Sequence, residues 1–147
     1  MILNGLPWRS STNVEILDLN DQSFSCNNFP KTKMMYGGVV GVVDNTPIVC
    51  GGKIGNLSRI NYCEKLDMDA KIWKRAVDLK EASFKSGKGS IYVNGSLLIS
   101  GGLASETLDT IELVSLTASS YAEFNLPLPL FGHCNIQIDD STVMITG

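Results

Sequence analysis

Short apolar runs separated by glycine, asparagine and aspartate recur along the chain. Residues Pro47–Cys50 and Leu97–Ser100 each form such a run, and each is followed by a pair of glycines. A run of this length bounded by glycine is long enough for a buried strand and too short for a helix. Similar runs stand at residues 1–5 and 143–147. The pattern therefore predicts an all-β fold.

A turn signal stands seven residues before the glycine that ends each of three runs. The pairs Asp44-Asn45 and Asn94-Gly95 tolerate positive φ angles, which close tight hairpins, and Asp140-Ser141 occupies the same place in the last run. The segments before these turns are expected to be the first strands of repeated units, at residues 39–43, 90–93 and 135–138. The apolar runs are then the second strands.

An acidic residue marks the segment that follows the glycines. Glu15, Glu64 and Glu112 recur at intervals of 49 and 48 residues, and each is followed by Leu or Val two positions later. An aromatic residue stands nine positions after each acid: Phe24, Trp73 and Tyr121. We expect the acid in a third strand and the ring in a fourth, where it buries against the neighbouring unit. A period near fifty predicts stacked units of four strands.

The order of these signals resembles the kelch repeat, which forms one blade of a β-propeller. The resemblance covers essentially the whole chain. The residues that carry it are the glycine pairs Gly51-Gly52 and Gly101-Gly102, the steps Val14-Glu15, Cys63-Glu64 and Ile111-Glu112, Asp18 and Asp67, and the aromatics Phe24, Trp73 and Tyr121. It implies a fragment of a kelch-type β-propeller with about three four-stranded antiparallel blades.

The repeat divides the chain into consecutive blades. Residues 1–35 are expected to form strands two to four of a first blade, and residues 36–85 and 86–130 a second and a third blade. Residues 131–147 then begin a fourth. Because such units bury their faces on their neighbours, open blade ends favour self-association.

Composition narrows the class of partner. The net charge is −3 and the twelve basic residues are scattered, which argues against nucleic-acid binding. There is no apolar run of membrane-spanning length and no signal-peptide pattern at Met1, so we expect no membrane association and a cytoplasmic location. The cysteines show no C-x-x-C spacing and are expected to be buried free thiols: Cys26, Cys50, Cys63 and Cys134.

The sequence shows no catalytic constellation. His133 is the only histidine, and it cannot build a two-histidine metal site, while Cys134 beside it in a strand points to the opposite face. The repeated glutamates occupy equivalent positions of successive units, which hold them apart rather than in one cleft. We expect them to be solvated or locally hydrogen-bonded. We therefore expect no enzyme, no catalytic residue, no metal ligand and no cofactor.

The kelch resemblance implies a protein-interaction module. In such a propeller, the loops between strands two and three and between strand four and the next blade gather on one face and hold a protein or peptide. The residues expected to bind a partner are Lys53, Asn56, Ser58, Arg59 and Lys85. The implied roles are substrate recognition in a cullin-type ubiquitin-ligase adaptor or a cytoskeletal scaffold. The alternative is a fragment of a kelch-propeller enzyme, galactose-oxidase-like or sugar-modifying.

Overall fold

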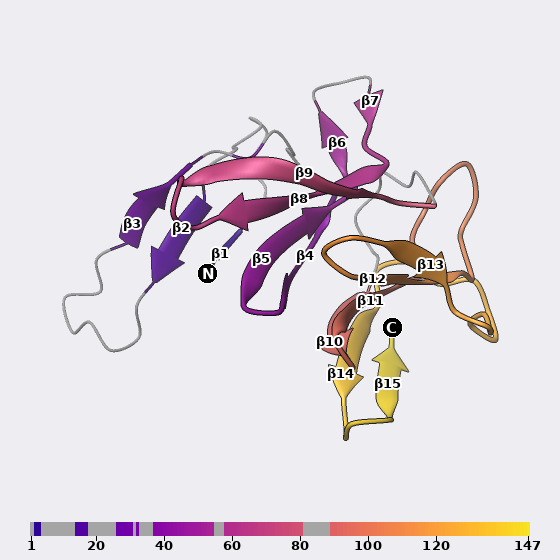
Figure 1. The fold of residues 1–147 in the computed structure, drawn as a ribbon. Coiled ribbons are helices and arrows are strands. Elements are labelled where there is room, and N and C mark those ends of the chain that lie inside the picture. Colours follow the sequence, from indigo (N-terminus) through magenta and orange to yellow (C-terminus); the bar gives the residue numbers. More distant parts are fainter. Residues whose placement is uncertain are drawn as a thin grey trace.

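The computed structural model describes residues 2–3, 14–17, 26–30, 32, 37–54, 58–80 and 89–147. These residues form antiparallel sheets, and none of them lies in a helix (Figure 1). The all-β prediction is confirmed for this part of the chain. The N-terminal sheet has three strands in the order β1-β2-β3, at Ile2–Leu3, Val14–Leu17 and Cys26–Phe29.

Two four-stranded antiparallel sheets follow. The second sheet has the order β4-β5-β8-β9, with strands at Val39–Val43, Thr46–Cys50, Tyr62–Asp67 and Ile72–Asp78. The third sheet has the order β10-β11-β12-β13, with strands at Gly89–Val93, Ser96–Ser100, Ile111–Val114 and Ser119–Tyr121. In both sheets the strands adjoin in chain order, so each sheet is a simple meander.

Two hairpins complete the described structure. The first, β6 at Lys53–Ile54 and β7 at Ser58–Arg59, is inserted between β5 and β8 and projects beyond them (Figure 1). The second, β14 at Cys134–Gln137 and β15 at Val143–Thr146, follows the third sheet. Strand β10 of the third sheet lies beside both β4 and β14. The third sheet is therefore next to the second sheet on one side and next to the β14–β15 hairpin on the other.

The strand pairs β1–β2, β5–β8 and β11–β12 share one register. Each pair joins the strand that carries the repeated acid to the strand before it in its sheet. Glu64 lies opposite Val49, Glu112 opposite Ile99, and Glu15 opposite Ile2. The next pair along is also the same in each sheet. It joins the residue before the acid to the residue that follows the acid's partner: Cys63 with Cys50, Ile111 with Ser100, and Val14 with Leu3. The sequence repeat is therefore a structural repeat.

The main core lies between the second and third sheets. Val43, Ile48 and Cys50 pack with Leu97 and Val114 in one buried cluster. Gly41 sits where the sheets come closest, because a Cβ built on it would fall 2.4 Å from Cδ1 of Leu97. Burial of each large aliphatic side chain contributes about 1.5–3 kcal/mol, which makes this interface the principal stabilising contact between the sheets.

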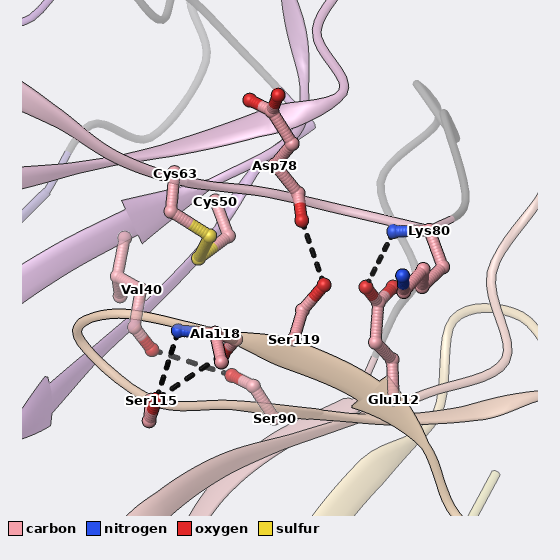
Figure 2. The surroundings of a disulfide bond; sticks show 10 residues. All are labelled: Val40, Cys50, Cys63, Asp78, Lys80, Ser90, Glu112, Ser115, Ala118 and Ser119. Carbon is pink, nitrogen blue, oxygen red and sulfur yellow. Dashed lines mark hydrogen bonds between the residues drawn. A yellow bond between two sulfur atoms is a disulfide. The ribbon is translucent and has the colours of Figure 1, made fainter.

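Two side-chain hydrogen bonds cross the same interface (Figure 2). The hydroxyl of Ser90 donates to the carbonyl of Val40 at 3.3 Å, and that of Ser119 donates to the carbonyl of Asp78 at 2.6 Å. Val40 and Ser90 are the second residues of β4 and β10. The first strands of the two sheets therefore lie level with each other.

The predicted turn and glycine geometry is confirmed in the second and third sheets, whereas Asp140 and Ser141 in the C-terminal hairpin do not adopt positive φ. Asp44, Asn45 and Asn94 adopt positive φ angles of 47°, 58° and 47° in the hairpin turns. The glycine pairs also have positive φ: 65° and 93° at Gly51 and Gly52, and 56° and 106° at Gly101 and Gly102. L-residues with a Cβ rarely adopt such angles, so the pairs end the second strands where only glycine fits without strain.

The prediction of buried free thiols was wrong for three of the four cysteines. Cys50 and Cys63 are directly opposed on β5 and β8, with Cα atoms 4.0 Å apart, and they form a disulfide within the core (Figure 2). Cys134 carries a free thiol but is exposed. The side chain of Cys26 lies outside the described residues. Strand register, rather than sequence spacing, brings the bonded pair together.

The aromatic residues do not share one structural position. Trp73 opposes Leu66, two residues beyond the acid, whereas Tyr121 opposes Glu112 itself. The difference arises because β8 continues three residues past Glu64 while β12 continues two past Glu112, so that Glu64 itself pairs with Arg75 rather than with the aromatic residue. Trp73 is half-buried, and Tyr121 is 46% exposed, so its predicted burial was wrong. Phe24 lies outside the described residues.

Candidate binding surface

In the second and third sheets, the segment after the fourth strand forms backbone hydrogen bonds with the segment between the second and third strands. In the second sheet, the N–H of Leu79, just after β9, donates to the carbonyl of Asn61, just before β8, at 2.7 Å. In the third sheet, the N–H of Leu126 donates to the carbonyl of Asp109 at the same distance. The segment after the fourth strand therefore lies along the segment between the second and third strands in both sheets.

The third sheet carries two further bonds of this kind. Leu130 N–H donates to the Leu108 carbonyl at 3.0 Å, and Gly102 N–H donates to the Leu130 carbonyl at 2.8 Å. Segment 124–131 is therefore held along its length against segment 102–109. We call these two segments together the loop surface. Among the described residues, the expectation that the two kinds of connection gather is confirmed for this sheet.

Three large apolar side chains are exposed on the loop surface. Phe124 is 67% exposed, Leu128 68% and Phe131 60%. Leu126, between them in sequence, is buried and anchors the segment. Contiguous exposed apolar surface marks interaction sites more often than singly scattered side chains do, and these three residues belong to one segment whose backbone is fixed. The sequence places this segment among the connecting loops, but it does not separate anchoring from exposed residues, because all of them are apolar.

Three of the residues predicted to bind a partner, Lys53, Ser58 and Arg59, lie on the β6–β7 hairpin. Lys53 and Arg59 are opposed across it, and Ile54 is opposed to Ser58. Arg59 is exposed, Lys53 is half-buried, and both make contacts within the molecule. The hairpin continues the β5–β8 ladder, since Ile60 N–H donates to the Gly52 carbonyl at 2.9 Å. Asn56 and Lys85 lie outside the described residues.

Two of the repeated glutamates form hydrogen bonds to the segments that connect the sheets, and the side chain of Glu15 lies outside the described residues. Glu64 is buried and accepts a 3.0 Å hydrogen bond from the hydroxyl of Thr32. Glu112 is buried and accepts a 2.6 Å bond from the N–H of Lys80 (Figure 2). Both donors stand 32 residues before their acceptor, in the segment that leads from one sheet to the next. The prediction that these acids are solvated or bonded only locally was therefore wrong for Glu64 and Glu112.

His133 joins the C-terminal hairpin to the third sheet. It is buried, and its Nε2 accepts the N–H of Gly89 at 3.2 Å and lies 2.8 Å from the hydroxyl of Ser100. Nε2 accepts a hydrogen bond only when it carries no proton of its own, so the imidazole is neutral with its proton on Nδ1. Within the described part of the chain, Nδ1 has no hydrogen-bond partner. Burial lowers the pKa of His133, because the charged ring would lose its hydration.

Ser100 and His133 do not form an accessible nucleophile and base. Ser100 is fully buried, and the amide nitrogen of Asn135 donates to its hydroxyl at 2.9 Å. This cluster fixes the hairpin, and it offers no room for a substrate. No three His, Cys, Asp or Glu side chains gather as metal ligands within the described ranges.

A groove of about 670 Å³ runs between the first strands of the second and third sheets. Its walls include Val40, Val42 and Tyr92, each more than 40% exposed, and the carboxylate-bearing Asp44 at the β4–β5 turn. The groove is thus at the turn end of these strands, whereas the loop surface is at the glycine end. The sequence pattern did not predict this groove. Its exposed apolar residues lie in strands that also carry buried core residues, so the sequence alone does not tell the two kinds apart.

No protein-family model matches the chain, and no curated protein matches it. Within the described residues, the structure also contains no helix long and apolar enough to cross a membrane. The functional interpretation therefore rests on the geometry of the chain itself.

Proposed function

We propose that the chain is part of a kelch-type β-propeller that binds a protein or peptide through its loop surface. The observation that carries the proposal is the exposure of Phe124, Leu128 and Phe131 on a backbone that is fixed by hydrogen bonds to the third sheet. A preorganised apolar surface loses little conformational entropy on binding, which favours affinity. Large aromatic and aliphatic anchors of this kind dominate the energetics of protein interfaces.

The repeat supports the propeller part of this proposal. The second and third sheets are four-stranded meanders with one register, level first strands and a common core, as successive blades would have. Within the kelch class, the resemblance implies a substrate-recognition role in a cullin-type ubiquitin-ligase adaptor or a scaffold role. The β6–β7 hairpin, with Lys53 and Arg59, would contribute polar contacts at the rim of the site.

The test is a peptide-display selection against the chain, followed by affinity measurement on the peptides recovered. A variant with Phe124→Ser, Leu128→Ser and Phe131→Ser should lose at least about tenfold in affinity, since each apolar anchor contributes more than 1 kcal/mol. The matched control is Met68→Ser with Ile72→Ser, which removes side chains that are 48% and 46% exposed at the β8–β9 turn. The control should bind as the wild type does.

A third variant separates the two candidate regions. Lys53→Ala, Asn56→Ala and Arg59→Ala together remove the polar residues that the sequence points to, and a smaller loss is expected because rim charges contribute mainly to association rate. If the serine variant folds and retains affinity while the control variant loses it, the loop surface is not the binding site.

A further inference from the structure

Two parts of the chain carry opposite charge. Residues 89–147, which begin with the third sheet, contain six acidic residues and no Lys or Arg, so their formal net charge is −6. The twelve basic residues are scattered over residues 1–88 with the other nine acidic ones, which gives +3 there and −3 for the whole chain. A charge asymmetry of this kind bears on the choice of partner rather than on the fold. The third sheet and the C-terminal hairpin are thus the acidic part of the molecule.

Three of these six acids border the loop surface. Glu106 and Asp109 lie in its first segment, and Glu123 directly precedes its second. The side chains of Glu106 and Glu123 are exposed, and that of Asp109 is half-buried. Of the other three acids, Glu112 is buried and two stand in the β14–β15 turn. The acids on the outside of the third sheet therefore gather around its exposed apolar side chains.

The backbone holds these acids in place. The N–H of Ala104 donates to the carbonyl of Glu106 at 2.9 Å, and the carbonyl of Asp109 accepts the N–H of Leu126 at 2.7 Å. Asp109 thus lies beside the buried residue that anchors the apolar segment. Within the described ranges, the carboxylates of Glu106, Asp109 and Glu123 form no ion pair. Their charge is available to a bound partner.

Exposed rings beside carboxylates suit the side chains of Arg and Lys. The apolar stem of such a side chain packs on an apolar surface while its charged group reaches a carboxylate. A guanidinium also stacks on an aromatic ring, and Phe124 and Phe131 are exposed rings. Glu123 stands next to Phe124 in the sequence. An acidic partner would instead meet like charges at this surface.

We infer that the partner segment bound at the loop surface is both apolar and basic: aliphatic or aromatic residues flanked by Lys or Arg. This inference rests on the proposed function and adds the chemistry of the partner. The apolar residues pack on the exposed side chains of the loop surface, and the basic residues face Glu106, Asp109 and Glu123 at its rim. Charges at a rim act mainly on the association rate and on its dependence on salt.

The same asymmetry gives the bound segment a direction. Lys53 and Arg59 of the β6–β7 hairpin belong to the basic part of the chain. Like charges repel, so the basic residues of the partner lie over the third sheet and away from this hairpin.

The test selects one random peptide-display library in parallel on the wild-type chain and on a variant with Glu106→Gln and Glu123→Gln. Peptides recovered on the wild type should be enriched in Lys and Arg beside apolar residues. They should bind the variant about two- to tenfold more weakly, mostly through slower association. Raising NaCl from about 50 to about 300 mM should weaken binding to the wild type more than binding to the variant, because salt screens the exposed carboxylates.

The matched control carries Asp44→Asn and Asp140→Asn. These substitutions also remove two exposed carboxylates, but at the β4–β5 and β14–β15 turns, away from the loop surface. The control should bind the basic peptides as the wild type does. An equal loss in the control and in the glutamine variant would show a general attraction between opposite charges and would overturn the inference.

The remaining outcomes separate this inference from the proposed function. Peptides without an excess of Lys and Arg that still require the apolar side chains of the loop surface would overturn the inference and leave the proposed function standing. Peptides that bind the serine variant of the loop surface as tightly as the wild type, or a wild-type chain that recovers no peptide, would overturn both. A wild-type chain that dimerises in sedimentation while the glutamine variant stays monomeric would assign the surface to a second copy of the chain instead.

Discussion

A buried carboxylate stands at the same place in the second and third sheets, and each one accepts a hydrogen bond from the segment that leads into its sheet. Glu112 receives the N–H of Lys80, and Glu64 receives the hydroxyl of Thr32. A carboxylate that leaves water loses hydration, and only hydrogen bonds to its oxygens offset that loss. The acid thus holds the segment between sheets in place, which in turn positions the following sheet.

Replacing Glu112 by Ala should lower the free energy of unfolding by about 1.5–3 kcal/mol, the range for hydrogen bonds to charged groups. The loss follows because the Lys80 N–H is left without its acceptor. Urea unfolding measures it. Glu106→Ala removes an exposed acid and should change stability by less than about 0.5 kcal/mol. Equal effects of the two substitutions would show that the Glu112 bond contributes nothing.

His133 should make stability depend on pH. Its pKa is lower in the folded chain than in the unfolded chain, so the unfolded state binds more protons at mildly acidic pH. Stability is therefore fully present above the unfolded pKa of about 6.5 and falls as the pH drops below it. His133→Gln should flatten the curve of unfolding free energy between about pH 5 and 7. An unchanged slope in the variant would rule out this role.

At the scale of the element, the glycine pair decides how the second strand of the third sheet ends. A Cβ on Gly101 would lie 2.4 Å from the carbonyl oxygen of Leu130, whereas one on Gly95 meets nothing within 4 Å, although both residues have positive φ. Gly101 is thus required both for its positive φ and for the close packing around it, whereas Gly95 is required for its positive φ alone.

Gly95→Ala should cost about 1–2 kcal/mol, which is the strain of a Cβ in the left-handed region. Gly101→Ala should cost about 1–3 kcal/mol more, because the loop surface must also shift. Thermal and urea unfolding of the two variants give the difference. If both lose the same stability, the contact between the glycine pair and the Leu130 segment is not a close one.

The disulfide should stabilise the second sheet. Cys50 and Cys63 close a loop across 13 positions, and a loop of about that size corresponds to about 3 kcal/mol through the entropy of the unfolded chain. Dithiothreitol should therefore lower the unfolding free energy of the wild-type chain. It should leave a Cys50→Ala, Cys63→Ala variant unchanged. A wild-type chain that is indifferent to the reductant would contradict the pairing.

Local chemistry made the strands and turns predictable. Asp44, Asn45 and the glycine pairs report backbone angles directly, so short apolar runs between them had to be strands. The Cys50–Cys63 disulfide and the buried glutamates could not be predicted, since both depend on which residues lie opposite or beside each other after folding. Nor could sequence sort the apolar loop 124–131 into anchors and exposed residues.

At the scale of the whole molecule, one sheet unit repeats along the chain and its connections gather at the glycine end. The third sheet covers one face of the second, where Leu97 lies over Gly41. The function proposed for the loop surface depends on this repeat holding one register from sheet to sheet.

The most direct test of the repeat is its register in solution. In isotope-labelled protein, non-hydrogen-bonded cross-strand pairs give strong Hα–Hα nuclear Overhauser effects because their Cα atoms are only about 4.5 Å apart. The structure predicts such effects for three corresponding pairs: Leu3 with Val14, Cys50 with Cys63, and Ser100 with Ile111. Effects displaced by one residue in any sheet, or absent from the third, would contradict a single repeated register.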